Sequence, residues 1–437
     1  MRSGGCRSVF LREAIDEEVK IEMIETLQKL VSFRSVAVPE GPDYPYGKET
    51  DRAKNYILSL AKEFGMRTVD VPGKYAYIEI GEGETLIGIL SHLDVVPEGK
   101  GWTHDPFGGE VTEDRIYGRG TTDDKGPTVA VLYAMKDLLE KGNLHKRIRL
   151  ILGQTEENGE WSDIAAYKEA EEIPSYGFTP DGDFPAIQCE LGAMVFDVRM
   201  PLAKSGILEA NGGTATNMVP STAKIRTEKA EYNAAGIACH GCAPWLGTNA
   251  ISKAMHQIAT EEGDNVPLAQ IYDELIGETI YGEKLGIDCE DESGRLSFNV
   301  GQIMMDEESQ SVKIMIDVRY PASYQSDGIV KTMVSKFEER GLSCEQIYHV
   351  HPLYTPSDSP VLQALVKAYR DVTEDESKPI SIGGGTYAKA MPNTVAFGPN
   401  YPGHENREHM EDEFILIDDF LKLREIYVEA LQNLLEI

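Results

Sequence analysis

The chain has 437 residues, which is too long for one compact core and predicts two domains. Hydrophobic residues make up 41% and charged residues 26%, as in ordinary globular proteins, and no run of about 18 apolar residues predicts a transmembrane helix. The formal net charge of −31 repels phosphate backbones and anionic membranes, so we expect neither nucleic acid nor a membrane as a partner.

The cysteine pattern and the first residues both bear on the compartment. The first 18 residues include basic side chains but lack the apolar core of a secretory signal, so we expect none. The cysteines are scattered without the spacing of a disulfide framework, which fits a reducing cytoplasm. They are Cys6, Cys189, Cys239, Cys242, Cys289 and Cys344.

The first half of the chain predicts an α/β arrangement. Residues 16–31 place apolar side chains at helical spacing. The apolar runs 86–90 and 148–152 predict buried strands of a mostly parallel sheet. Between them, residues 128–139 predict a helix that begins just after Pro127. In such a sheet, flanked by helices, an active site is expected beyond the carboxyl ends of the strands.

The middle of the chain contains a short repeat. The string FDVRMP at 196–201 recurs as IDVRYP at 316–321, and each copy reads as a strand that ends in proline, as strands leaving a sheet edge do. The recurrence indicates a domain with an internally repeated plan; the alternative is coincidence between two amphipathic strands.

The last part returns to the pattern of the first. Sheet-like motifs reappear at 382–398, and the segment from Phe414 to Leu435 predicts an amphipathic helix. We therefore predict an α/β catalytic domain made of residues 1–187 and 355–437, interrupted by an inserted α+β domain over residues 188–354.

Polar residues with metal-binding chemistry follow the predicted strands. His92 and Asp94 stand two apart at the end of the first strand, where a carboxylate can hold the second ring nitrogen of a ligand histidine. Asp123 and Asp124 lie in a glycine-bounded turn before the predicted helix, a position where carboxylates also serve simply as helix caps.

Further candidates follow in chain order. Glu156 and Glu157 end the next strand, Asp181 follows in a later loop, and His404 and His409 lie near the C-terminus. Taken alone, each of these residues could equally be a charged surface residue or a helix cap. Together they give an oxygen–nitrogen ligand set that suits Zn²⁺, Mn²⁺ or Co²⁺. Three carboxylates against two dications leave a net charge of +1, which would favour ionisation of a bound water.

These motifs resemble a known family. S-H-L-D-V-V-P, G-R-G-x-x-D-D-K-G-P, T-E-E-N, T-P-D, G-G-G-T-Y and H-M-E-D-E are similar, in order and spacing, to those of the co-catalytic zinc peptidases. That family includes aminoacylase, carboxypeptidase G and carnosinase. The resemblance runs from about residue 15 to the end, and D-D-K-G-P with G-G-G-T-Y looks most like the dipeptidase V branch.

The resemblance implies a role for each residue of the catalytic portion. One metal would be held by His92, Asp123 and Asp181, and the other by Asp123, Glu157 and His409, with Asp123 bridging and its peptide bond to Asp124 in the cis form. Glu156 would be the general base and Asp94 the partner of His92. Two Zn²⁺ ions are the expected cofactors, with Mn²⁺ or Co²⁺ as alternatives.

The insert resembles the lid domain of the family. By that resemblance His240 stabilises the transition-state oxyanion, Asn217 and Arg319 contact the substrate, and the backbone around Gly384 faces its carboxylate. The chain departs from the family pattern at Lys389, where arginine is frequent. Lysine is a point charge without the bidentate fork of arginine, which weakens the expectation of carboxylate contacts there.

The expected activity is hydrolysis of dipeptides, whose free amine would meet Asp124 or Asp181. An N-acyl-amino-acid deacylase and a catalytically silent relative remain alternatives; the silent relative would gain nothing from a base at Glu156.

An insert of this size favours a monomer, with a homodimer as the alternative. The spacing of Cys239 and Cys242 is also that of a redox or zinc site, but no second C-x-x-C follows.

Overall fold

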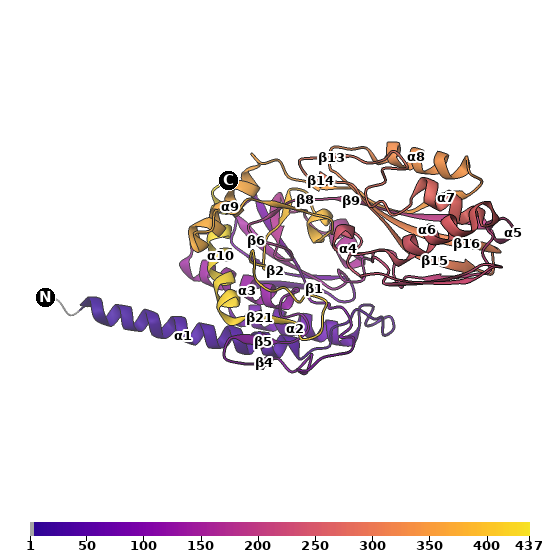
Figure 1. Ribbon diagram of the computed structural model, residues 1–437. Coiled ribbons are helices and arrows are strands. Elements are labelled where there is room, and N and C mark those ends of the chain that lie inside the picture. The colour runs from indigo at the N-terminus through magenta and orange to yellow at the C-terminus, as the bar shows by residue number, and fades with distance from the viewer. Residues whose placement is uncertain (1–3) are drawn as a thin grey trace. The chain divides into compact units, whose positions relative to one another are not determined.

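The computed structural model describes residues 4–437, and their side chains from residue 17 onward. The segment that bears on a secretory signal, and Cys6 within it, lie outside the described side chains. The chain forms two compact units (Figure 1). The first consists of Met1–Gln188, Thr355–Ile380 and Thr386–Ile437, and the second of Cys189–Tyr354 and Ser381–Gly385. The second unit thus takes in part of the glycine-rich segment, which the sequence analysis assigns to the catalytic domain.

The first unit is built on a sheet with a parallel centre. Its strand order is β1-β2-β6-β3-β7-β20-β8. The inner strands β6, β3, β7 and β20 run parallel, whereas β1, β2 and β8 join antiparallel at the two sides. The bounds are β1 (Arg67–Val71), β2 (Tyr75–Ile80), β3 (Leu86–His92), β6 (Arg147–Gly153), β7 (Tyr176–Thr179), β8 (Ile187–Glu190) and β20 (Thr394–Ala396).

Helices and a small second sheet complete this unit. The helices are α1 (Gly4–Val31), α2 (Lys48–Glu63), α3 (Lys125–Lys141), α4 (Ser162–Ala170), α9 (Pro360–Thr373) and α10 (Ile417–Leu435), with the 3₁₀ turn η3 (Tyr387–Ala390). The small sheet has the order β21-β5-β4, from β4 (Glu110–Val111), β5 (Arg115–Tyr117) and β21 (Phe414–Leu416). Two more short strands pair with β8: β18 (Leu353–Tyr354), whose residues belong to the second unit, and β19 (Ile380–Ile382), of which only Ile380 belongs to the first.

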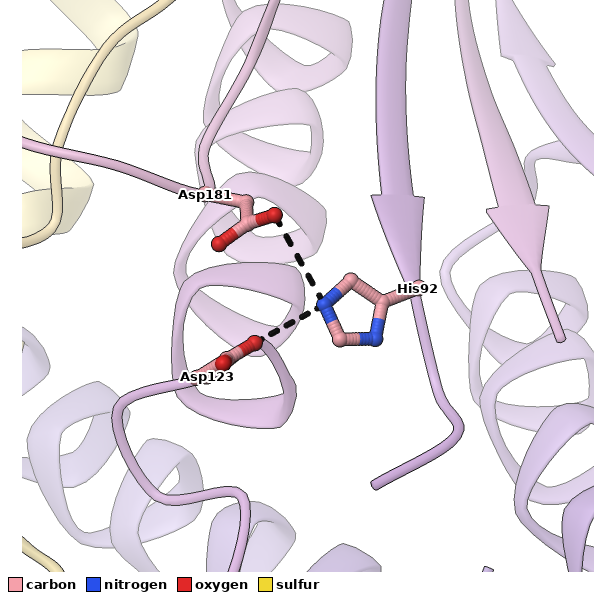
Figure 2. A group of neighbouring side chains, drawn as sticks. All are labelled: His92, Asp123 and Asp181. Atoms are coloured by element: carbon pink, nitrogen blue, oxygen red, sulfur yellow. Dashed lines mark ion pairs between the residues drawn. The ribbon is translucent and has the colours of Figure 1, made fainter. Parts of the chain in front are cut away.

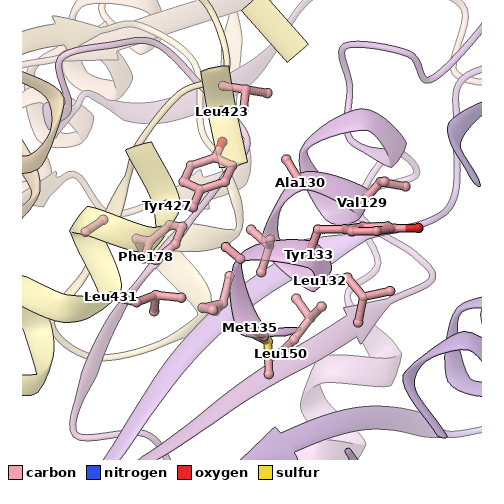
Figure 3. Packing of buried hydrophobic residues seen from close by; sticks show 14 of the residues in the cluster. Val129, Ala130, Leu132, Tyr133, Met135, Leu150, Phe178, Leu423, Tyr427 and Leu431 are labelled. Carbon is pink, nitrogen blue, oxygen red and sulfur yellow. The ribbon is translucent and has the colours of Figure 1, made fainter. Parts of the chain in front are cut away.

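Helix α3 lies at the centre of the main core. Figure 3 shows its apolar side chains packed between the sheet and α10, with Phe178 of β7 stacked on Tyr427 of α10. Leu431 of α10 is also fully buried, a position that contributes about 1.5–3 kcal/mol of transfer free energy. This packing fixes the N-terminus of α3, and with it the Asp123–Asp124 turn that comes directly before it.

The second unit is an antiparallel sheet of order β12-β11-β10-β15-β16-β9-β17 with helices packed on it. The strands are β9 (Gly192–Pro201), β10 (Glu209–Gly212), β11 (Thr222–Arg226), β12 (Glu231–Ala235), β15 (Ser297–Asp306), β16 (Ser311–Tyr320) and β17 (Ser343–Val350). Strands β13 (Glu290–Asp291) and β14 (Gly294–Arg295) pair only with each other, as a separate two-stranded sheet. The helices are α5 (Leu202–Ser205), α6 (Ala250–Glu262), α7 (Pro267–Leu275) and α8 (Ser326–Glu338), with 3₁₀ turns η1 (Pro244–Leu246) and η2 (Gly263–Asn265).

Three sequence expectations need correction. Helix α3 begins at Lys125 rather than after Pro127, because the turn that ends at Asp124 already leads into it. Residues Phe414–Leu416 form strand β21, which pairs with β5, so the last helix begins at Ile417. The two copies of the D-V-R repeat do not lie at a sheet edge: β9 and β16 are neighbours inside the sheet, with Phe196 opposite Ile316.

Two further findings concern the whole described chain. None of its helices combines the length and the apolar character that crossing a membrane requires. Among the described side chains, Cys239, Cys242, Cys289 and Cys344 are free thiols.

Candidate metal centre

A first group of ligand side chains gathers at the carboxyl end of β3 (Figure 2). His92 is the last residue of that strand and is fully buried. Its Nε2 atom lies 2.8 Å from Asp123 Oδ1 and 3.8 Å from Asp181 Oδ2. His92 ends strand β3, whereas Asp123 and Asp181 come from two loops at the same edge of the sheet, where the fold class predicts an active site.

A second group shares one residue with the first. It consists of Asp123, Glu157 and His409. His409 Nε2 lies 2.9 Å from Asp123 Oδ2 and 3.1 Å from Glu157 Oε2. The two oxygens of Asp123 therefore point to different histidines, as a bridging carboxylate would. His409 has φ 61°, a left-handed conformation that non-glycine residues adopt infrequently and mostly where their surroundings impose it.

Glu413 accepts hydrogen bonds from the backbone of the turn that carries Asp123, a role that the sequence did not predict. One Glu413 oxygen accepts hydrogen bonds from the backbone N–H groups of Gly120 (3.0 Å) and Thr122 (3.1 Å) and a longer one from Asp123 (3.4 Å). The other pairs with Arg119 at 2.5 Å, and both side chains are buried. Gly120, at φ 89°, supplies the left-handed conformation that the turn needs. The peptide bond between Asp123 and Asp124 is cis, as the family resemblance implies.

Asp94 holds the loop that carries Glu156 and Glu157. Its two carboxylate oxygens accept hydrogen bonds from the backbone N–H groups of Glu156 (3.2 Å) and Glu157 (3.0 Å). The nearest oxygen to His92 Nδ1 is the main-chain carbonyl of Asp94 at 3.0 Å, whereas its carboxylate is 3.6 Å away. Asp94, which the sequence predicts as a partner of His92 only, thus contacts both His92 and the loop that carries Glu156 and Glu157.

The electrostatics of the cluster favour bound cations. Burial, with Asp123 close by, raises the pKa of Asp181 to about 8. Burial and the neighbouring Asp181 raise the pKa of Glu156 well above its ordinary value. Burial lowers the pKa of His409, but Asp123 and Glu157 raise it to about 11. Crowded carboxylates therefore compete for protons in this site, and bound dications would relieve that repulsion.

Unsatisfied atoms support the same conclusion. Among the side chains that the structure describes, His92 Nε2 and Asp123 Oδ1 are buried without a hydrogen-bond partner of acceptable geometry. Such groups are rare unless an ion or water satisfies them. Imidazole nitrogen and carboxylate oxygen are donor types that suit Zn²⁺, Mn²⁺ or Co²⁺, so the residues present fit a pair of divalent metals.

Two carboxylates near the ligands differ from expectation. Asp124 is fully buried; its Oδ2 atom accepts hydrogen bonds from Ser91 and from the backbone N–H of His92, whereas its Oδ1 atom has no hydrogen-bond partner among the described side chains. Glu408, which the sequence analysis did not single out, accepts hydrogen bonds from Asn400 (2.7 Å) and Asn406 (2.9 Å). Burial, together with Asp123, raises the pKa of Glu408 to about 8. His404 contacts Asp419 and belongs to neither ligand group.

The residues assigned to the insert gather within the second unit. The backbone N–H of Gly241, next to His240, donates to the carbonyl of Asn217 at 2.7 Å. Arg319 donates to Asp317 (2.9 Å) and to the carbonyl of Gly383 (2.9 Å), which places it beside Gly384. His240 Nδ1 lies 2.9 Å from Cys242 Sγ. The two chain segments are closely packed, because a Cβ atom added at Gly383 would lie 2.5 Å from Cys242 Cβ.

A parallel-centred α/β sheet with two ligand groups joined by one carboxylate defines the class of co-catalytic metallohydrolases. The family model described as peptidase family M20/M25/M40 matches residues 88–433. "Putative dipeptidase YtjP" of Bacillus subtilis (strain 168) is 34% identical over 95% of this chain and 97% of its own length.

Solved structures share the fold. Human carnosine dipeptidase 1 is 16% identical, has a TM-score of 0.65, and matches over 97% of this chain and 98% of its own. The YXEP protein of Bacillus subtilis, described as a dinuclear metal binding peptidase, is 13% identical, has a TM-score of 0.59, and matches over 96% and 99%. The chain belongs to peptidase family M20/M25/M40 and is a hydrolase of the peptidase class, which confirms the family predicted from its motifs.

Proposed function

We propose that this protein is a metal-dependent dipeptidase that hydrolyses dipeptides with a free amine and a free carboxylate. The observation that carries the proposal is the sharing of Asp123 between two ligand groups, with Glu156 beside them. The name of the Bacillus subtilis relative, "Putative dipeptidase YtjP", supports the substrate class.

In the proposed reaction His92, Asp123 and Asp181 hold one metal, and Asp123, Glu157 and His409 hold the other. The metals, when bound, supply a water of lowered pKa and polarise the scissile carbonyl. Glu156 accepts a proton from the attacking water and passes it to the leaving amine. Asp94 keeps Glu156 and Glu157 in place through their backbone N–H groups.

The second unit would act as a lid that recognises the substrate. His240 would donate to the developing oxyanion, while Arg319, Asn217 and the backbone at Gly384 would bind the terminal carboxylate. A tripeptide would place its additional residue against this anchor and leave charged groups desolvated without partners, at a cost of several kcal/mol. We therefore expect dipeptides to be preferred over tripeptides.

The remaining parts of the proposal concern cofactor, assembly and compartment. The nitrogen and oxygen ligands support Zn²⁺, with Mn²⁺ and Co²⁺ as alternatives. The free thiols support a reducing compartment such as the cytoplasm. The acidic composition gives no support to a nucleic-acid or membrane partner. An inserted unit of this size supports a monomer, and light scattering would reveal a homodimer instead.

The test is an assay of the metal-reconstituted protein on dipeptides, tripeptides and N-acetylated amino acids. Chelation should abolish turnover, and Zn²⁺, Mn²⁺ or Co²⁺ should restore it. Dipeptides should have the highest kcat/KM. A higher kcat/KM for N-acetylated amino acids would reassign the protein as a deacylase, and no turnover of any substrate at full metal occupancy would make it a silent relative.

A further inference from the structure

A second buried carboxylate, that of Asp163, holds the loop that carries Glu156. Asp163 is the second residue of α4, and its side chain is fully buried. Its Oδ2 atom accepts the backbone N–H of Gln154 at 2.5 Å, and its Oδ1 atom accepts the hydroxyl of Thr155 at 2.6 Å. Oδ1 also accepts the backbone N–H of Ile164 at 2.8 Å. One side chain therefore joins the start of α4 to the two residues directly before Glu156.

The far side of the same loop is closed by Trp161. Its backbone N–H donates to the carbonyl of Thr155 at 3.4 Å, and its indole N–H donates to the carbonyl of Glu156 at 3.3 Å. Trp161 has φ 49°, a left-handed conformation that a bulky residue keeps only where its surroundings enforce it. Its ring packs edge-on against Tyr387, with 5.4 Å between the ring centroids. The loop therefore returns to its own start, where Asp163 joins the two ends.

Asp94 and Asp163 hold adjacent parts of this loop. Asp94 accepts the backbone N–H groups of Glu156 and Glu157, whereas Asp163 binds the two residues that precede them. Each of the four consecutive residues 154–157 is thus hydrogen-bonded to a buried carboxylate. The direction of the Glu156 side chain depends on this backbone, because φ and ψ decide which rotamers are allowed.

The contacts of Asp163 are with the loop rather than with the metal ligands. Among the described side chains, the two ligand groups do not include Asp163. Its three partners, Gln154, Thr155 and Ile164, all donate to it, so both of its oxygens act as acceptors. Removing the carboxylate would leave buried donors without a partner, and the loop would have to move to satisfy them.

We propose that Asp163 is a positioning residue for the reaction: through Gln154 and Thr155 it fixes the backbone from which Glu156 reaches the attacking water. The inference rests on the proposed function, in which Glu156 is the general base. Proton transfer requires donor and acceptor atoms about 2.6–3.2 Å apart, so a small shift of the loop would slow the transfer. Glu157 would still be held by Asp94 and by its metal, so the metals should remain bound.

The test is a double-mutant cycle between Asp163→Ala and Glu156→Gln in the metal-loaded protein. With Glu156 intact, Asp163→Ala should lower kcat by about 10²-fold, the loss that a misplacement of about 1 Å can cause, and change KM by less than about twofold. In the Glu156→Gln protein, Asp163→Ala should change the remaining kcat by less than about twofold, because residues that act as a unit are not additive. Metal content should stay at two ions per chain throughout.

A milder pair of variants keeps the proposal testable if Asp163→Ala does not fold. Thr155→Val removes the hydroxyl that Asp163 accepts but keeps the side-chain shape, and it should lower kcat by about tenfold, as loss of one hydrogen bond does. Thr155→Ser keeps the hydroxyl and should keep kcat within about twofold of the unaltered protein. Equal kcat values for the valine and serine variants would contradict the proposal.

The matched control is Asp375→Ala in the same unit. Asp375 also accepts from a hydroxyl and a backbone N–H, those of Tyr369 and Ser377, but it belongs to neither ligand group and has no contact with the loop at 154–157 among its hydrogen bonds. Its replacement should leave kcat and KM unchanged, although it removes a carboxylate of the same kind.

Three outcomes separate this inference from the proposed function. An equal loss of kcat with and without Glu156, or a loss of metal on Asp163→Ala, would overturn the role of Asp163 alone. Near-normal turnover in Glu156→Gln would remove the base from the proposed function and the inference with it. The cycle is run on the substrate with the highest kcat/KM, whether a dipeptide or an N-acetylated amino acid, so a deacylase activity would leave the test of Asp163 unchanged.

Discussion

The two units carry opposite kinds of polar site. At the carboxyl end of β3, the first unit gathers hydrogen-bond acceptors, namely the carboxylates of Asp123, Glu156, Glu157 and Asp181. The second unit brings together the guanidinium of Arg319 on β16, which donates to Gly383, and the loop residues Asn217 and His240, whose side chains can also donate. A cluster of acceptors needs cations, and a cluster of donors suits anions. In the proposed function, the metals would bind in the first unit, and the second unit would recognise the carboxylate and the oxyanion.

The largest effect is expected in the acceptor cluster. Glu156→Gln should keep the fold and both metals but lower kcat by at least about 10²-fold, because amide nitrogen cannot take the proton from water. Glu160→Gln, an exposed neighbour, serves as the control. Steady-state kinetics with metal analysis would check this, and near-normal turnover in Glu156→Gln would remove this residue from the mechanism.

The next effect probes the donor cluster. His240→Ala should lower kcat by about 10²–10³-fold, as removal of an oxyanion donor does, and leave the metal content unchanged. The comparison between the two units predicts that no variant of the second unit releases metal. Loss of metal on His240→Ala, or unchanged turnover, would contradict the division of roles.

A smaller effect comes from the two D-V-R copies, which provide a matched pair. Arg199 binds Asp197 as Arg319 binds Asp317, each arginine two residues from its carboxylate. Arg199 also contacts Asp306, whereas Arg319 contacts Gly383. Lysine keeps the charge but lacks the fork, so Arg319→Lys should raise KM for dipeptides by about 10-fold.

Arg199→Lys should leave KM unchanged within about twofold, since this arginine has no contact in the glycine-rich segment. Measuring KM for both variants against the same dipeptide checks the pair. Equal changes in both would show that the Asp–Arg pairs support the sheet alone.

The smallest effect on activity is expected from the cores. Leu431→Ala in the first unit and Ile258→Ala in the second each empty a fully buried position, which costs about 2–5 kcal/mol of unfolding free energy. At 25 °C kcat/KM should change by less than about twofold. Hydrogen exchange should rise only in the unit that carries the change; a rise in both units would show that they unfold together.

The sequence places candidate ligands after recognisable strands and turns, and the family resemblance selects five of them, because short motifs record these local positions. The structure brings those five side chains together. Their supports were harder to find. Glu413 contacts a turn 290 residues earlier in the chain; it ends the H-M-E-D-E motif, but the motif alone does not indicate this distant contact.

The wrongly predicted start of the last helix has the same cause, namely a contact between residues far apart in the sequence. Residues 414–416 have apolar spacing that fits a helix, and only their pairing with 115–117 makes them a strand. Likewise, Asp94 reads from sequence as the partner of the nearby His92. Its bonds to Glu156 and Glu157 depend on the approach of a loop more than 60 residues away.

The order of the ligands along the chain has a consequence for biosynthesis. His92, Asp123, Glu157 and Asp181 are all translated before the second unit, but His409 emerges only after it. The nascent chain therefore displays the complete first group while the second still lacks its histidine, and Glu413, which anchors the bridging turn, follows four residues later. If the two groups bind metals as proposed, one ion can bind before synthesis ends, whereas the second site is complete only after His409 and α10, which follow the second unit, have folded.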